Sequence, residues 1–334
     1  MSDDLFSRFR IAPGAPAAAA GTPPETPQPT FGDESGLAYR QVAHQLRASE
    51  ADLLAAIERI PSMPIVVQKL LARTGDLASS TAGLEDLIKQ DMGLAGRLLK
   101  LVNSPFYGLG AQVGSITQAV SIIGMASLKS LAVAASTSNL LAVDLSAYGY
   151  IDKGLWLNSC ATAALAKSVA QRNGSSRDEA EEYFVGGLLR DIGMLVLGPF
   201  LAQHQTSLRK KSATGEPVDA DILRRERSLL GWDHCWAGEK VAERWTLPEG
   251  LLLVIGHHHR IPPDANVKVL RQLAGVRLAE RLTYAAAIGL VKDHPFDHQI
   301  DPLLIQAAGL TAAKFGELVK DMSGIVAKSD LSNA

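Results

Sequence analysis

Apolar residues recur at intervals of three and four positions through most of this chain, from about Leu37 onward. Few segments alternate apolar and polar residues at every second position, as half-buried strands do. The observed spacing follows the 3.6-residue turn of an α-helix, so that one stripe of each segment can face a shared core. The sequence therefore predicts an all-α protein, a multi-helix bundle that begins with an N-terminal helical subdomain.

The first part of the chain has a different composition. Residues 13–35 read PGAPAAAAGTPPETPQPTFGDES. Such a Pro- and Ala-rich stretch cannot bury enough apolar surface to offset the entropy lost on ordering. We therefore expect a disordered tail over residues 1–48.

Capping signals and burial patterns define several helices. Asp91 stands where it can cap one helix, and Ser115 with Gln118 forms a capping-box pattern before the next. A helix over residues 153–171 is apolar on more than one side, which predicts deep burial and carries Asn158 inward. Further helices are predicted over residues 179–198, 202–212, 218–230, 234–245, 248–258, 267–290 and 301–327.

Charge and cysteine content exclude several classes of protein. Lys and Arg total 33 against 35 Asp and Glu, a formal charge of −2, so we expect no long-range attraction to nucleic acid or to an anionic membrane. Cys160 and Cys235 lie far apart within apolar helical patterns, as reduced core thiols do. Residues 1–11 lack an apolar run, and longer apolar runs elsewhere stop short of the roughly 20 residues that a membrane span needs. We expect a cytoplasmic protein without a membrane-spanning segment.

Several short motifs follow one another in a fixed order. They read IPSMP at 60–64, QDMGLAGRLLKLVNSPFYG at 90–108, SITQAVSIIG at 115–124, GGLLRDIGMLV at 186–196, GWDH at 231–234, WTLP at 245–248 and a His pair at 257–258. Together they resemble the HDOD domains, which are related to the HD metal-dependent phosphohydrolases. The resemblance implies an HD-like helical bundle and a role in bacterial signal transduction. It covers residues 53–258, with 259–334 as a helical extension that packs on the bundle or continues it.

The same resemblance supplies a template for a metal site. HD hydrolases hold a divalent metal with a His on one helix, a His-Asp dyad on the next and an Asp on a later helix, because the metal must activate water and polarise phosphate oxygens. Carried over by motif, these positions fall at Asn158, at Arg190 and Asp191, and at Glu280. Only Asp191 matches the template. An amide oxygen is a poorer ligand than imidazole, and a guanidinium has no lone pair to donate.

Arg190 is the decisive departure from that template. A carboxylate such as Asp191 inside an apolar segment needs a cation or hydrogen-bond donors nearby, and an arginine supplies both. On this interpretation Arg190 replaces the metal, and Glu280 completes a buried charge network. The alternative is that Arg190 and Glu280 lie at the edge of the bundle and extend to solvent.

Three histidines keep a metal site open as a hypothesis. His234, His257 and His258 resemble additional metal ligands of the HD-GYP phosphodiesterases, and with Asp191 they would make four ligands. The alternative is structural, because histidines at helix ends commonly act as caps or as hydrogen-bonded groups.

These observations lead to three hypotheses. The first is a non-catalytic signalling module without a cofactor, which binds protein partners in trans or a nucleotide ligand through the degenerate site, and which can form a homodimer. The second is a weak metal-dependent phosphohydrolase or cyclic-dinucleotide phosphodiesterase. The third, nucleic-acid binding through the short helices near Asp91, is disfavoured because the second helix carries only Arg97 and Lys100 as basic residues.

Overall fold

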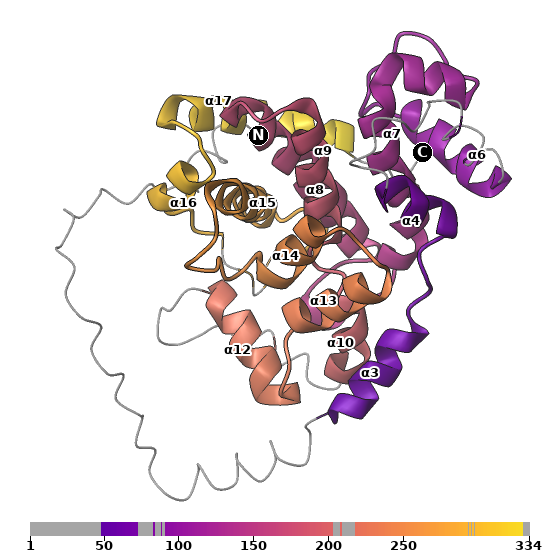
Figure 1. Cartoon of the computed structure of the whole chain (residues 1–334). Helices are drawn as coiled ribbons and strands as arrows, with labels where there is room; N and C mark the ends of the chain where they lie inside the picture. Colours follow the sequence, from indigo (N-terminus) through magenta and orange to yellow (C-terminus); the bar gives the residue numbers. More distant parts are fainter. Residues whose placement is uncertain are drawn as a thin grey trace, which may run out of the picture.

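Figure 1 shows a computed structural model of the chain, which describes residues 48–72, 83, 88, 91–202, 208, 218–292, 294, 296 and 298–329. Residues 1–47 of the predicted tail lie outside the described residues. The same holds for residues 203–207 and 209–212 of the helix predicted over 202–212.

Helices make up all the regular structure of the described residues, apart from one isolated antiparallel bridge between Tyr150 and Leu290. The predicted all-α fold is confirmed. The elements are α3 (Glu50–Arg59), α4 (Ile65–Ala72), α6 (Met92–Val102), α7 (Ile116–Leu141), the 3-10 helix η1 (Ser146–Tyr148), α8 (Gly154–Asn173), α9 (Arg177–Leu189), α10 (Met194–Leu201), α12 (Val218–Leu230), α13 (His234–Arg244), α14 (Glu249–His257), α15 (Val267–Ala285), α16 (Pro302–Ala307) and α17 (Ala312–Ser329).

Short polar side chains begin two helices where the sequence predicted them. Asp91 caps α6 by accepting a 2.9 Å hydrogen bond from the backbone N–H of Leu94. Ser115 caps α7 in the same way, accepting from the N–H of Gln118 at 3.1 Å. The side chain of Gln118 accepts from the N–H of Gly114 instead of Ser115, so only half of the predicted capping box forms.

Helix α8 lies inside the bundle and packs against α9, α15 and α17 (Figure 1). Most of its residues are buried, as the sequence predicted. Small residues permit this close packing. An added Cβ on Gly187 of α9 would stand 3.0 Å from Cα of Ala163 in α8. Two of these neighbours of α8, namely α15 and α17, belong to the predicted extension over 259–334.

The N-terminal helices share one apolar core with the bundle. Helices α4 and α6 pack on α7, and Figure 1 shows these three helices together at one side of the molecule. Helix α7 bends at Gly124, whose φ of +78° lies in the left-handed region that glycine tolerates. Beyond the bend, Ser127 donates a 2.6 Å hydrogen bond to Glu181 of α9. Helix α3 lies apart from α4 and packs on α10 and α13.

The prediction of one helix over residues 179–198 is wrong, because the structure divides this segment into α9 and α10. After α9 the backbone hydrogen bonds join residues three positions apart instead of four. The N–H of Ile192, for example, donates to the carbonyl of Leu189 at 3.0 Å. Gly193 brings this turn into backbone contact with α13, where an added Cβ would stand 2.0 Å from the carbonyl oxygen of His234. The two residues that follow α9 are thereby held in the interior.

Two other predicted helices also have different bounds. The helix predicted over 267–290 ends at Ala285, and Ala287 takes a left-handed conformation with φ of +50°. The helix predicted over 301–327 consists of α16 and α17, which are separated at Gly309 with φ of +77°. A left-handed residue interrupts the helical hydrogen-bond pattern, and periodicity alone does not reveal it.

Two segments are long and apolar enough to span a membrane by length and composition, Ile116–Leu141 and Arg177–Leu201. The expectation that every apolar run stops short of such a span is therefore not met. In the most apolar window of these segments, 56% and 89% of the residues are buried inside the protein. Core helices of this kind pass the same test, so burial within the bundle accounts for their composition.

Candidate functional site

Arg190 directly follows α9, and its side chain is completely buried. Its Nε donates to Glu280 Oε1 at 2.8 Å, Nη1 to the Gly187 carbonyl at 2.9 Å, and Nη2 to Asn158 Oδ1 at 2.5 Å. Nη2 also forms an ion pair with Asp191 Oδ2 at 2.9 Å. Each guanidinium nitrogen thus has a partner, and the side chain joins α8, α9 and α15. We call Asn158, Arg190, Asp191 and Glu280 the ionic cluster.

The alternative in which Arg190 and Glu280 extend to solvent is wrong, because both residues are 0% exposed. Their neighbours are held in place as well. The side-chain amide of Asn158 donates to the Ile288 carbonyl at 3.0 Å, and the Tyr284 hydroxyl donates to Glu280 Oε1 at 3.3 Å. The four positions carried over from the HD template therefore lie together in the interior.

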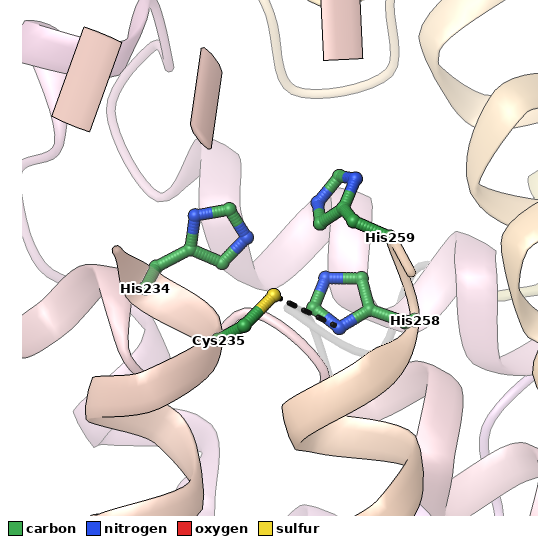
Figure 2. Close-up of side chains that lie close together, drawn as sticks. All are labelled: His234, Cys235, His258 and His259. Carbon is green, nitrogen blue, oxygen red and sulfur yellow. Dashed lines mark hydrogen bonds between the residues drawn. The ribbon is translucent and has the colours of Figure 1, made fainter. Parts of the chain in front are cut away.

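Three histidines and a cysteine lie beside the ionic cluster. His234 and Cys235 begin α13, whereas His258 and His259 directly follow α14, and Figure 2 shows the four side chains gathered between these segments. One nitrogen or sulfur atom from each residue lies within 4.8 Å of the others. Cys235 Sγ is 3.9 Å from His258 Nδ1. We call these four residues the imidazole-thiol cluster.

Asp191 connects the two clusters. Its Oδ1 lies 3.4 Å from His258 Nε2 and 3.7 Å from His234 Nε2, distances that are long for hydrogen bonds. These three atoms are buried and have no hydrogen-bond partner in the described part of the chain. Asp191 and His258 also form a second compact group with His259 and Glu280, again within 4.8 Å.

Glu226 of α12 orients the ring of His234. Its carboxylate oxygens lie 2.8 and 2.9 Å from His234 Nδ1, and Oε2 accepts from the His234 backbone N–H at 3.0 Å. The Tyr148 hydroxyl donates to Glu226 Oε1 at 2.6 Å. Because Nδ1 faces Glu226, Nε2 of His234 faces Asp191. His258 is held in a similar way, since its Nδ1 lies 3.0 Å from the Ile255 carbonyl.

His257 does not join this arrangement, which corrects the sequence-based ligand set. It is the last residue of α14, is only half-buried, and belongs to neither compact group. The residues that face inward are His258 and His259, because the helix ends at His257 and the chain turns after it. The ring of His259 packs edge-on against His234, with centroids 5.0 Å apart.

Charges inside the two clusters shift the pKa values of their members. Burial opposes ionisation of Asp191, but Arg190 together with His258 and His234 outweighs burial and holds the pKa of Asp191 well below its usual range. Burial also opposes protonation of His258, yet Cys235 and Asp191 raise the pKa of His258 to about 10. Burial would raise the pKa of Cys235, but His258 and His234 lower it to about 6. The interior thus holds ionised groups of both signs side by side.

The imidazole-thiol cluster fits a transition-metal ion such as Zn²⁺. Imidazole nitrogen and thiolate sulfur are preferred zinc ligands, and four of them fill a tetrahedral site. Glu226 is the kind of partner that orients a metal-bound histidine, and the Nε2 atoms of His234 and His258 lack hydrogen-bond partners. Arg190 does not fit the HD template, because its guanidinium stands at a ligand position and has no lone pair. A divalent ion would lower the pKa of bound water and polarise phosphate oxygens.

Several of these residues were missed by sequence reasoning. Cys235 directly follows His234, and His259 completes a run of three histidines. The sequence therefore offered both as candidate ligands, but only the positions of the helix ends show that they face the site. Glu226 lies in the charged run at 224–227, a pattern typical of a solvated helix face. Tyr148 carries no sequence signal that would link it to the site.

Fold and site together define a helical protein with an interior charge cluster at the positions that the sequence resemblance assigns to an HD metal site. The sequence model of the HDOD domain matches residues 60–261, which is more than half of the chain. The chain belongs to the HDOD family. The matched range includes every residue of the two clusters except Glu280, which α15 supplies from beyond it.

Solved structures of three bacterial proteins share this fold. An HDOD domain protein of unknown function from Geobacter sulfurreducens has a TM-score of 0.67 at 22% identity, covering 88% of this chain and 98% of that one. A candidate signal transduction protein from Marinobacter aquaeolei has a TM-score of 0.63 at 20% identity, covering 90% and 67%. A candidate phosphohydrolase from Shewanella amazonensis has a TM-score of 0.60 at 22% identity, covering 85% and 97%. At these identities the likeness shows the fold alone.

A relative by sequence is an uncharacterized protein of Treponema pallidum, 28% identical over 218 residues. The match covers 65% of this chain but spans only 40% of the length of that relative. The shared region is therefore one part of a longer protein in that organism.

Proposed function

We propose that this chain is a non-catalytic signalling module of the HDOD family, which acts in the cytoplasm by binding protein partners in trans. The proposal rests on one observation above all, the full engagement of the buried Arg190 guanidinium by Asn158, Asp191, Glu280 and the Gly187 carbonyl. A guanidinium held in this way does the electrostatic work that a metal ion does in an HD hydrolase, without offering a site for water activation.

The ion pairs of the ionic cluster support this proposal. Asp191 and Glu280 are buried carboxylates, and an uncompensated charge at such a depth costs several kcal/mol, on the order of 3–5 kcal/mol. Arg190 forms an ion pair with each carboxylate and satisfies the oxygen of Asn158, and the imidazoles of His234 and His258 lie beside the negative charge that is left over. Any ligand that withdrew Arg190 from the cluster would have to replace these contacts.

Burial of the site gives further support. Arg190, His234, His258 and Glu280 are all 0% exposed, and Asp191 is 1% exposed. Two cavities of about 270 and 280 Å³ in the described part of the chain are lined by none of these residues. A phosphodiester or a nucleotide would have to separate helices to reach Asp191. Binding of partners at the surface needs no such opening, which favours it over turnover.

The imidazole-thiol cluster supports a second candidate, a signalling module that holds a structural transition-metal ion. The supporting observation is the pair of unpartnered Nε2 atoms on His234 and His258, beside Cys235 and His259. Four protein ligands leave no open position for substrate in a tetrahedral site. Metal binding there is compatible with a non-catalytic role and differs from the phosphohydrolase alternative, which requires Asp191 to be accessible.

Metal content and turnover of the full chain test these proposals together. The protein is purified without chelators, its metal is measured by mass spectrometry, and hydrolysis of bis-p-nitrophenyl phosphate and of cyclic dinucleotides is assayed with added Mn²⁺, Fe²⁺ or Zn²⁺. We expect no turnover, whatever the metal content. Metal-dependent hydrolysis that is lost in Asp191→Asn would overturn the non-catalytic proposal. The variant Arg190→His, which restores the dyad, serves as the positive comparison, and sedimentation of the same samples tests for a homodimer.

A further inference from the structure

Helix α3 packs across two helices that also pack on each other, α10 and α13 (Figure 1). Its buried side chains are Leu53, Ile57 and Ile60, the last of which directly follows the helix. Their spacing of four and three positions places them on one face. The opposite face is exposed at Ala51 and Ala55. We call the part of α10 and α13 that α3 covers the α3-binding surface.

Helix α3 is attached less extensively than the helices of the core. Two of its ten residues are buried, against six of the eleven residues of α13. Its N-terminal end is closed within the helix itself, because the Ser49 hydroxyl accepts from the Asp52 N–H at 3.1 Å and the Asp52 carboxylate accepts from the Ser49 N–H at 3.3 Å. Residues 61–64, which include two prolines, connect α3 to α4 without regular structure. Elements with few buried residues open at a lower free energy than the core, so we expect α3 to detach before the rest of the bundle opens.

The polar contacts of α3 gather at its C-terminal end, on residues of α13 and the residue that follows it. Arg244 Nη1 donates to the Ile60 carbonyl at 2.6 Å, Nη2 donates to the Glu58 carbonyl at 3.2 Å, and Nε pairs with Glu58 Oε2 at 3.1 Å. Trp245 Nε1 donates to the Pro61 carbonyl at 3.0 Å. The last carbonyls of a helix lack partners within the helix, and a cation stabilises that end. Because every helix ends in such carbonyls, these donors suit any helix that lies here in the same direction, and the contact with Glu58 favours an acidic residue at that position.

Both helices of the α3-binding surface lead directly to the candidate site. Helix α10 begins at Met194, at the end of the turn that carries Asp191, and α13 begins with His234 and Cys235. The backbones of that turn and of α13 are in contact at Gly193. A helix on the α3-binding surface therefore touches both elements that position Asp191 against His234, and its exchange for another helix would act on the interior from outside.

We propose that the α3-binding surface receives an amphipathic helix of a protein partner, and that α3 occupies this surface until the partner helix displaces it. The partner helix carries apolar residues at positions i, i+4 and i+7, as α3 does with Leu53, Ile57 and Ile60. An acidic residue at i+5 takes the place of Glu58 beside Arg244. This inference rests on the proposed function, which calls for a protein partner without saying where the partner binds.

A peptide of residues 49–64 serves as the probe, stapled through the exposed positions 51 and 55 so that it is helical in solution. Its binding to the full chain is measured by fluorescence anisotropy. In the chain variant Leu53→Asp with Ile57→Asp, α3 no longer competes, so we expect the peptide to bind at least about tenfold more tightly than it binds wild type. Leu54→Asp, at a position that is 43% exposed on the same helix, is the matched control and should behave as wild type. A peptide that carries both aspartate substitutions should not bind.

Two further measurements locate the peptide and test the release of α3. Adding Arg244→Met to the double-aspartate chain should weaken peptide binding, because the donors for the helix end are then lost. Hydrogen exchange of the unmodified chain needs no variant, and we expect the amides of α3 to exchange at least about tenfold faster than those of α13. Circular dichroism checks that each variant is folded, and hydrogen exchange decides the matter if the double-aspartate chain is not.

Four outcomes would overturn the proposal. They are equal peptide affinities of wild type and the folded double-aspartate chain, peptide binding that Arg244→Met leaves unchanged, exchange of α3 as slow as that of α13, and a wild-type dimer that the double-aspartate substitution abolishes. The last would assign the surface to α3 of a second copy. Metal-dependent hydrolysis would instead overturn the non-catalytic function and leave the peptide measurements as they are, so the two failures can be told apart.

Discussion

The two neighbouring clusters in the interior differ in how their side-chain nitrogen atoms are engaged. In the ionic cluster, every guanidinium nitrogen of Arg190 has a partner. The side-chain amide of Asn158 accepts a hydrogen bond on its oxygen and donates one from its nitrogen. In the imidazole-thiol cluster, the Nε2 atoms of His234 and His258 face Asp191 across more than 3.3 Å and have no hydrogen bond. The nitrogens of Arg190 are therefore all engaged, although both oxygens of Asp191 and Oε2 of Glu280 form no hydrogen bond within the described part of the chain, whereas the second cluster leaves imidazole nitrogens that can bind a metal ion.

This difference indicates that the ionic cluster stabilises the fold, whereas the imidazole-thiol cluster can bind a metal ion. Removing a member of the ionic cluster leaves buried charges unpaired, so the cost falls on stability. Changing the surroundings of the imidazole-thiol cluster affects ligand affinity first, because several of its polar atoms already lack partners. Variants in the two clusters should therefore separate stability from metal binding.

The largest effect is expected for Arg190→Met. The substitution leaves Asp191 and Glu280 buried without a cation, so we expect a loss of about 3–5 kcal/mol in the free energy of unfolding, measured by urea denaturation. The exposed Arg260→Met is the matched control and should change this free energy by less than about 0.5 kcal/mol. Equal losses in the two variants would refute the structural role of Arg190.

Tyr148→Phe removes one buried hydrogen bond to a carboxylate. Tyr148 donates to Glu226 at 2.6 Å, and hydrogen bonds to charged groups contribute about 1.5–3 kcal/mol. The same substitution at Tyr183, whose hydroxyl lies 3.4 Å from the Asn173 amide nitrogen, should cost clearly less. Thermal or urea unfolding of both variants compares them, and the reverse order would contradict the contact described for Glu226.

Glu226→Gln tests metal binding by the imidazole-thiol cluster. If the cluster binds Zn²⁺, loss of the carboxylate behind His234 should weaken zinc affinity by about 10–100-fold, measured by chelator competition. Glu243→Gln, which removes only the exposed partner of Lys240, is the control. Identical zinc affinities in wild type and Glu226→Gln would count against the metal-binding candidate.

The smallest effect is expected for His257→Ala. His257 is half-buried and belongs to neither compact group, so its removal should change the free energy of unfolding by no more than about 0.5 kcal/mol and leave metal content unchanged. His258→Ala in the same assays provides the contrast, because His258 is fully buried between Asp191 and Cys235. Loss of metal in His257→Ala would restore the ligand set that the sequence had favoured.

The sequence predicted the helical class and the inward position of Asn158, because both depend on helical period, and it offered inward positions of Arg190 and Glu280 as one of two interpretations. It did not predict the end of α9 at Leu189. That break depends on the contact of Gly193 with α13, more than 40 residues further on, and no local signal records such a contact. Periodicity therefore located the helix but not its interruption.

Some site residues also could not be predicted from local sequence. The choice between His257 and His259 depends on where α14 ends and on the turn that follows, within a run of three identical residues. Glu226 was missed because a carboxylate among arginines is typical of solvated faces, whereas here it is 0% exposed between Tyr148 and His234. Both distinctions arise from tertiary packing.

The contact at Gly193 also bears on how a signal could cross the molecule. With no side chain between them, the turn that carries Asp191 and the first residues of α13 rest directly on each other's backbone. Backbone atoms in contact cannot relieve a clash by a change of rotamer. A displacement of α13 is therefore expected to move the turn that carries Asp191 by a similar distance. Trp232 and Trp236 lie at the start of α13 with ring centroids 4.2 Å apart, and because both are only partly buried, a partner bound at the surface could contact them and displace the helix.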